Sequence, residues 1–275
     1  MSDPRAALDA IGQLPDSEID IADAALQLAR VDAPDADWEE AREHLSDIAR
    51  AVAALADTLI DADLATRAVA LSGLLGGRFG YKGDAENYDD PKNANLIHVV
   101  KRRRGLPVAL GTIWLHAARA AGWDAHGVDF PAHFLVALMG EKTQSILDVF
   151  NGGTPLSGRD LRALLRRVEG EKAELRPGLL RPMTARRVLL RLQNNIMTRR
   201  LQSDDTAGAL ACAEDMLRIA PDHAELWRQA AAMNQQMDRV GAALRCYDRF
   251  LALVPDGEVA SQVRTLVGSL RSRLN

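Results

Sequence analysis

The chain has few aromatic residues, only two cysteines and no excess of positive charge. Aromatic side chains make up 4% of its 275 residues but 47% are hydrophobic, so the core is expected to be mainly alanine, leucine and valine in packed helices. Two cysteines cannot form a disulfide framework, which is typical of a protein from a reducing cytosol. A net charge of −4 argues against a general nucleic-acid or membrane-surface binder.

Long apolar runs are also missing. No stretch of about 18 apolar residues occurs, so we expect no membrane-spanning helix. The first residues carry early acidic groups and no apolar segment, which is unlike a signal peptide. We therefore expect a cytoplasmic protein that binds neither nucleic acid nor membrane, and its oligomeric state stays open.

The first 80 residues are predicted to be helical. Apolar residues recur at three- and four-residue spacing in Ile19–Arg30 and Asp37–Leu55, and Leu64–Leu75 is a third apolar segment that ends at two glycines. Residues 77–95 are rich in Gly, Asn, Asp and Pro, which predicts an ordered loop.

The middle of the chain changes from helical to strand-like patterns. After a short helix at Leu96–Arg103, the segment Pro107–Ala121 is apolar on nearly every side, which predicts a buried helix. Three short segments rich in Val, Leu, Phe and Ile follow, and they predict an antiparallel sheet from Trp123–Phe130, His133–Met139 and Ser145–Val149.

The last third contains an internal repeat. Ala209–Asp222 matches Ala243–Asp256 in register, and Cys212 and Cys246 lie 34 residues apart in the numbering. A helix-turn-helix period of 34 residues is the signature of the tetratricopeptide repeat. Five residues fall on that motif's expected positions: Trp227, Ala231, Ala243, Tyr247 and Pro255. The sequence thus predicts an α+β protein with a helical N-terminal region packing on the core at 1–80, a core with a small antiparallel sheet at 81–180, and all-α repeats at 181–275.

His133 and Asp148 are spaced as in the active site of a thiol enzyme, but the thiol is missing. Such an enzyme needs a cysteine at a helix N-terminus, a histidine to take its proton and a carboxylate to orient the histidine. Here Pro107 or Val108 stands where the cysteine would be, and both cysteines lie in the repeats.

Four segments in this order resemble a known family. They read NYDDPKNANL (Asn87–Leu96), RRRGLPVAL (Arg102–Leu110), GVDFPAHFLV (Gly127–Val136) and ILDVFNGG (Ile146–Gly153). They resemble the transglutaminase-like core of bacterial invasion-regulon-regulator homologues with C-terminal tetratricopeptide repeats. The resemblance implies a papain-like α+β core. It also implies that His133 and Asp148 correspond to catalytic residues of active transglutaminase-like enzymes, although the resembled family generally lacks the cysteine.

Each candidate residue has a structural alternative. His133 and Asp148 form either a retained dyad in a pocket or a hydrogen-bonded pair that holds the sheet. Pro107 is a favoured first residue of a helix. Asn87, Tyr88 and Asn151 either line the mouth of the pocket or hold the loops in place. His126, Asp129 and His133 have a spacing that suits a helix better than a strand broken by proline, so we expect no metal or other cofactor.

Three functions are compatible with these patterns. The absent nucleophile beside a repeat favours a non-catalytic adaptor or regulator that binds a protein or peptide in the repeat groove. The alternatives are a cysteine-independent amide or ester hydrolase, or a sensor of a small ligand, each using the His133–Asp148 pair.

Overall fold

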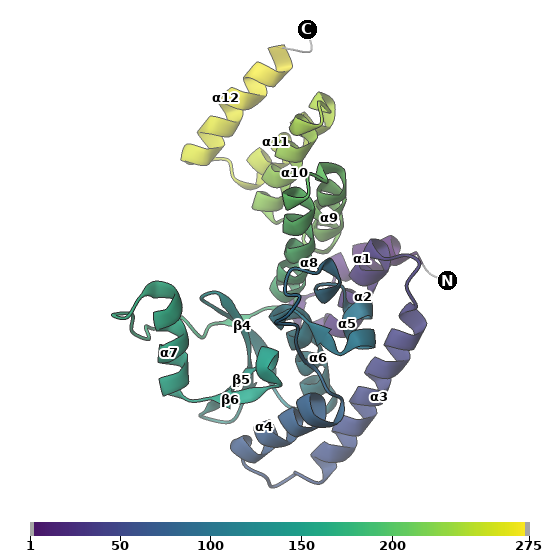
Figure 1. Cartoon of the computed structure of the whole chain (residues 1–275). Coiled ribbons are helices and arrows are strands. Elements are labelled where there is room, and N and C mark those ends of the chain that lie inside the picture. Colours follow the sequence, from purple (N-terminus) through teal and green to yellow (C-terminus); the bar gives the residue numbers. More distant parts are fainter. Residues whose placement is uncertain (1–2, 273–275) are drawn as a thin grey trace. The chain divides into compact units, whose positions relative to one another are not determined.

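The structure is a computed structural model that describes residues 3–272, and it forms two compact units (Figure 1). One unit comprises residues 15–192. The other joins the described residues up to Leu14 to those from Gln193 onward. The division falls inside helix α8 (Ala185–Gln202). Each unit is described separately below.

In the larger unit, helices come before, between and after the strands of a small sheet along the sequence. Its helices other than α8 are α2 (Ile21–Asp32), α3 (Trp38–Asp57), α4 (Leu64–Ser72), α5 (Leu96–Arg102), α6 (Pro107–Ala120) and α7 (Gly158–Glu169). Most begin at a polar residue whose side chain accepts a backbone N–H, as Asp20, Asp37 and Asn95 do. A π-helix, η2 (Gly73–Arg78), extends α4, and single 3-10 turns lie at η1 (Asp16–Glu18), η3 (Pro91–Asn93) and η4 (Val149–Asn151).

Two sheets belong to this unit. The main one has five strands in the order β6-β5-β4-β3-β7, and every neighbouring pair is antiparallel. Its strands are β3 (Ala125–Phe130), β4 (His133–Met139), β5 (Gln144–Asp148), β6 (Thr154–Leu156) and β7 (Pro182–Met183). A second sheet pairs β1 (Lys82–Gly83) with β2 (Arg104–Gly105) in parallel.

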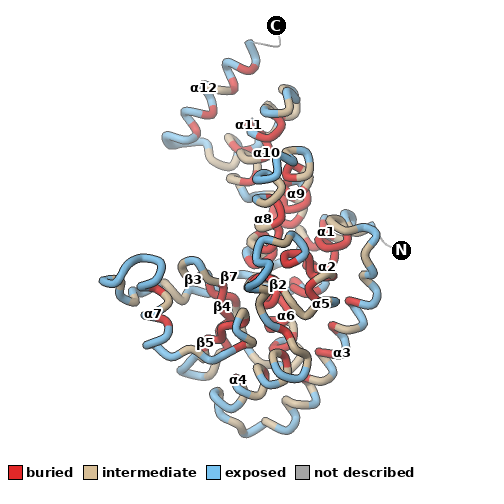
Figure 2. The backbone as a smooth tube through the Cα atoms, viewed as in Figure 1, coloured by how far each residue is buried: buried red, intermediate tan, exposed pale blue. Residues whose placement is uncertain are grey.

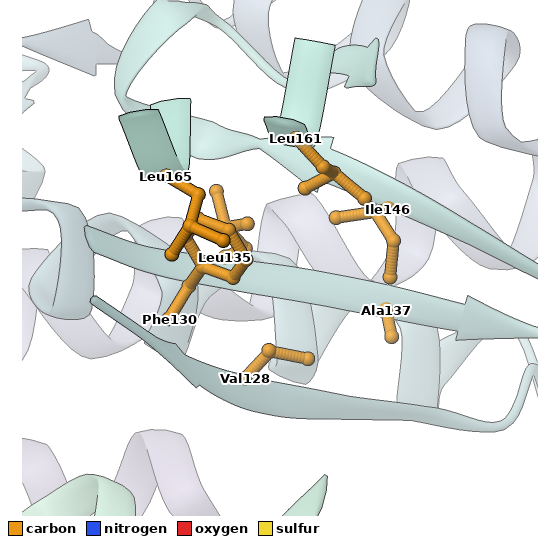
Figure 3. Packing of buried hydrophobic residues seen from close by; sticks show 7 residues of the cluster. All are labelled: Val128, Phe130, Leu135, Ala137, Ile146, Leu161 and Leu165. Carbon is orange, nitrogen blue, oxygen red and sulfur yellow. The ribbon is translucent and has the colours of Figure 1, made fainter. Parts of the chain in front are cut away.

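The main sheet is covered on both faces. On one face, Phe130 and Leu135 of the strands pack with Leu161 and Leu165 of α7 (Figure 3). On the other face, the ring of Phe134 lies over α6. Helix α6 is buried over most of its length (Figure 2). Neighbouring residues of β4 therefore point to opposite faces, as strand geometry requires.

The smaller unit is all helical. It contains α1 (Pro4–Gly12), α9 (Thr206–Ile219), α10 (Ala224–Gln236), α11 (Val240–Leu253) and α12 (Glu258–Ser272). Ala231, Ala243, Tyr247 and Phe250 form a buried cluster with residues of α12. Helix α1 packs on α9, and Leu8 of α1 is fully buried.

The α+β class, the small antiparallel sheet and the repeat helices are confirmed. The expected strand His133–Met139 has the same bounds in the structure, and the expected helix at residue 107 begins there. The structure differs in adding β6, β7, the parallel β1–β2 pair and the π-helix. It also groups α1 with the repeats, because this helix packs on α9.

Candidate functional site

The start of α6 is where a thiol enzyme would carry its nucleophile. Pro107 is the first helical residue, and the capping position, Leu106, makes no side-chain hydrogen bond. The first turn reads PVALG, so it contains no nucleophilic side chain. The nearest hydroxyl within the helix, on Thr112, is buried and donates to the carbonyl of Val108 at 3.1 Å. That geometry satisfies the hydroxyl and removes it from any substrate.

His133 begins β4, at the end of the β3–β4 hairpin. It pairs directly with Phe130, and the turn between them has Ala132 at φ 56°. Directly paired residues share a face of a sheet, so the register places His133 on the face of Phe130 and Leu135, which α7 covers. The next residue, Phe134, faces α6. The register thus directs His133 away from the face on which α6 packs.

Asp148 ends β5 and caps the 3-10 turn η4. Its carboxylate accepts hydrogen bonds from the backbone N–H of Phe150 at 3.1 Å and of Asn151 at 3.3 Å. It also accepts one from the side-chain amide of Asn151, at 2.7 Å. Leu147 pairs with Val136, so Asp148 comes level with Leu135, two residues from His133. Within residues 3–272, no hydrogen bond or ion pair joins the two side chains of the predicted dyad.

Two of the other predicted pocket residues, Tyr88 and Asn151, lie at η4. The rings of Tyr88 and Phe150 lie with centroids 5.9 Å apart, and Asn151 is bonded to Asp148. The carbonyl of Asn87 accepts a hydrogen bond from the buried Asn93 amide at 2.7 Å. Helix α6, which Pro107 begins, also contacts η4. Tyr88 and Asn151 therefore lie at η4, whereas Asn87 is bonded to η3 and helps to hold that loop.

Arg191 was missed by the sequence analysis. This residue of α8 is paired with Asp129, donates to the carbonyl of His133 at 3.1 Å and lies over the ring of Phe134 at 5.6 Å from its centroid. Burial lowers the pKa of Arg191 from its usual value, and the nearby Tyr88 opposes this shift. Arg191 therefore joins α8 to the start of β4. The only sequence signal is its four-residue spacing from Arg187, which is common on exposed helices.

His126 and Asp129 have separate surroundings. His126 lines a cavity of about 590 Å³ between the end of α6 and the start of α8. Its Nε2 atom is buried without a hydrogen-bond partner in the described chain, and burial lowers the pKa of this histidine. Asp129 is paired with Arg191 instead. His126, Asp129 and His133 therefore do not converge, and residues 3–272 contain no cluster of three such side chains suited to a metal ion.

The repeat-motif residues serve packing. The indole N–H of Trp227 donates to the carbonyl of Pro221 at 2.8 Å, and the hydroxyl of Tyr247 donates to Gln235 at 3.2 Å. Ala231 and Ala243 are fully buried between α10 and α11. Pro255 lies in the connection from α11 to α12. Small residues at these contacts let the helices approach closely, as the repeat requires.

Comparisons with known proteins agree with this architecture. A family model described as the transglutaminase-like superfamily matches residues 39–194, and a tetratricopeptide-repeat model matches residues 196–268. A UPF0162 protein of Xylella fastidiosa is 33% identical over 190 residues, which is 68% of each chain. A UPF0162 protein of Pseudomonas aeruginosa is 29% identical over 263 residues, covering 92% of this chain and 91% of its own.

Two more distant likenesses add little. Mouse F-box only protein 21 is 29% identical over 82 residues, which is 13% of its length. A crystal structure of menin matches with a TM-score of 0.37 and 10% identity, over 90% of this chain and 70% of menin.

The fold and the two family models define a transglutaminase-like protein with C-terminal tetratricopeptide repeats. The chain belongs to the transglutaminase-like superfamily, and its bacterial relatives of matching length are UPF0162 proteins. None of the helices in residues 3–272 combines the length and apolar character needed to span a membrane.

Proposed function

We propose that this protein is a non-catalytic adaptor or regulator in the cytoplasm that binds a protein or peptide partner through its repeats. The observation that carries this proposal is the first turn of α6, which starts with Pro107 and offers only apolar side chains and a glycine. Acyl transfer through a thioester needs a thiolate as the nucleophile. The N-terminus of a helix is suited to hold one, because it lowers the pKa of a thiol there. This chain has no group that could replace it in that turn.

The surroundings of Asp148 support the same proposal. In a catalytic triad the carboxylate holds the histidine in the reactive tautomer. Here the carboxylate accepts three hydrogen bonds from residues of η4, which take up three of the about four acceptor sites of an ionised carboxylate. Asp148 therefore stabilises a turn, and within residues 3–272 its carboxylate makes no hydrogen bond to His133.

The repeats supply the binding surface. Stacked helical repeats form extended surfaces that bind peptides or helices of other proteins. In this chain the motif residues maintain the stacking of α10, α11 and α12 through buried contacts. Their exposed neighbours, such as Ala232 and Gln236 of α10, are then available to a partner.

The catalytic side of the proposal is tested by activity assays on the purified full chain. We expect no amidase, esterase, protease or transglutaminase turnover above that of a buffer blank, for the wild type and for His133→Ala alike. Robust wild-type turnover that disappears in His133→Ala would overturn the proposal and support the cysteine-independent hydrolase.

The binding side is tested with peptides selected on the full chain from a displayed library. Hydrogen exchange with a selected peptide should slow in α10 and α11, and its affinity should be unchanged in His133→Ala and Asp148→Asn. Protection confined to residues 15–192, or loss of affinity in His133→Ala, would instead place recognition at the old pocket, as in a ligand sensor.

A further inference from the structure

Two cationic side chains lie next to each other on the small parallel sheet. Lys82 of β1 is the register partner of Arg104 of β2. Neighbouring strands lie about 5 Å apart, and directly paired residues project to the same side of the sheet. Like charges placed in this way repel each other, so the pair costs free energy unless an anion lies nearby.

No carboxylate of the described chain forms an ion pair with Lys82 or Arg104. Within residues 3–272, neither Lys82 nor Arg104 has a carboxylate oxygen within 4.0 Å. The adjacent Asp84 lies 3.9 Å from Arg102 and accepts the backbone N–H of Asn87 at 3.0 Å. Glu86 is exposed on the loop that follows. The local acidic groups are thus either engaged elsewhere or open to solvent.

Arg104 is held in place by its own hydrogen bonds. Its Nη1 atom donates to the carbonyl of Gly80 at 3.1 Å and to that of Arg103 at 2.9 Å. A guanidinium carries five N–H donors in a planar fork, so its Nη2 and Nε groups remain for another acceptor. A fixed guanidinium loses little conformational entropy when it binds an anion.

Both cations line a cavity of about 570 Å³. Phe150 and Asn151 of η4 form part of its wall. The Phe150 ring lies so close over Gly83 of β1 that a Cβ at Gly83 would lie 2.3 Å from it. Asp84 and Glu86 line the cavity as well, but Asp84 lies 3.9 Å from Arg102 and Glu86 is exposed. The cavity therefore offers two neighbouring cations without a carboxylate within 4.0 Å, an aromatic wall and an amide, in a volume that suits a small molecule.

We propose that this cavity binds a small organic anion. Its phosphate or carboxylate group would lie between Lys82 and Arg104, and its hydrocarbon part would contact Phe150. An oxyanion can accept hydrogen bonds from the ammonium and from the guanidinium at the same time. Hydrogen bonds between charged groups are stronger than those between neutral groups. This site goes beyond the adaptor function, because it lies in residues 76–152 and uses no residue of the repeats.

The test is an NMR titration of the full chain with phenyl phosphate, benzoate and benzyl alcohol. The three compounds share a ring and differ in charge. We expect phenyl phosphate or benzoate to shift the amide signals of Lys82 and Asn151 saturably. The compound that binds with the higher affinity identifies the anionic group that the cavity prefers. Benzyl alcohol should bind at least tenfold more weakly, and 0.5 M NaCl should weaken binding of the anions.

Matched variants decide whether Lys82 and Arg104 are responsible for binding the anion. Lys82→Ala should weaken binding of the preferred anion at least tenfold, and Lys82→Glu should abolish it. Lys142→Ala removes an exposed lysine from the β4–β5 connection, outside the cavity, and should leave binding unchanged. Equal affinity in Lys82→Ala and wild type, equal loss in Lys142→Ala, or no saturable shift with either anion would overturn the proposal. Lys82 is exposed, so its replacement should leave the fold intact. A thermal melt of each variant checks this.

Discussion

Gly12 at the end of α1 packs against the backbone carbonyl of Arg218 in α9. A Cβ added at Gly12 would lie 2.1 Å from that oxygen. The same helix pair is joined by Arg5, whose Nε donates to the buried Asp215 at 2.9 Å, and by Asp9, which accepts from Arg218 at 2.8 Å. The close approach at Gly12 therefore brings the chain's first helix within bonding distance of the repeats.

Replacement of Gly12 by alanine should loosen this contact. Alanine usually stabilises a helix relative to glycine, but here the new methyl group meets a backbone oxygen that cannot rotate away. We expect Gly12→Ala to reduce the free energy of unfolding of the repeat unit by about 1–3 kcal/mol. Urea denaturation, together with hydrogen exchange of the α1 amides, measures the effect.

Gly268 provides the matched control. It lies within α12, and a Cβ there would meet nothing within 4 Å. Gly268→Ala should therefore stabilise the unit by about 0.5–1 kcal/mol, through helix propensity alone. If both alanine variants changed the free energy of unfolding equally, α1 would not be packed closely on α9 at Gly12.

Asp148 should behave as a turn cap. Asp148→Ala removes the acceptor of three hydrogen bonds in η4, so we expect a loss of about 1–2 kcal/mol of stability in urea. Asp148→Asn keeps an oxygen that can accept from the backbone and should lose less than half of that. Asp61→Ala, at an exposed aspartate without a hydrogen bond in the described chain, should stay within about 0.5 kcal/mol of wild type. Equal stability of Asp148→Ala and wild type would contradict the capping role.

His44 of α3 should stay neutral well below neutral pH. Burial, and then the adjacent Arg103, lower its pKa from 6.5 to about 4. Its Nδ1 atom lies 3.1 Å from Nη2 of Arg103, which can only donate, so Nδ1 accepts and Nε2 carries the proton. In the unfolded chain the imidazole binds a proton near pH 6.5, so unfolding takes up a proton between about pH 6.5 and 4. The contribution of His44 to stability is thus complete above pH 6.5 and falls as the pH decreases through this window.

Two measurements check the behaviour of His44. Its imidazole signals in NMR should titrate near pH 4, and Arg103→Gln should raise that midpoint without restoring 6.5, because burial remains the larger cause. His44→Gln should make the loss of stability between pH 7 and pH 5 smaller than in wild type. A midpoint above pH 6 in the wild type would show that the imidazole is not buried as described.

Local patterns in the sequence predicted the elements but not all of their partners. A short apolar segment and the break at Pro131 before it were enough to place β4, and Pro107 marked the start of α6. β7 was missed because it has only two residues, one of them proline, in a segment rich in chain breaks. Its pairing with β3 joins Val128 to Pro182, which are far apart along the chain, and no local pattern encodes such a contact.

The candidate site shows the same limit. The spacing of His133 and Asp148 resembled that of a dyad, and the register places Asp148 level with Leu135, on the face that His133 shares. Spacing along the chain does not predict which donors the carboxylate of Asp148 accepts from. The DVFN sequence after β5 also suits a turn in which aspartate accepts the following N–H groups, and the structure has this arrangement. The pairing of Lys82 with Arg104 arises from a parallel contact between segments on either side of α5.

Arg191 should be more important for stability than its neighbour Arg187. Both arginines of α8 approach Asp129, but Arg191 also donates to the His133 carbonyl and covers Phe134, and its side chain is 28% exposed against 59% for Arg187. An exposed ion pair such as Arg187 with Asp129, at 3.9 Å, contributes little, so Arg187→Ala should change stability by less than about 0.5 kcal/mol. Arg191→Ala leaves a carbonyl without its donor and uncovers an aromatic ring, so we expect a loss of about 1–3 kcal/mol. Arg191→Lys should recover only part of this, because an ammonium cannot reproduce the planar contact with the ring. Equal urea midpoints for the two alanine variants would show that the guanidinium of Arg191 does not hold the start of β4.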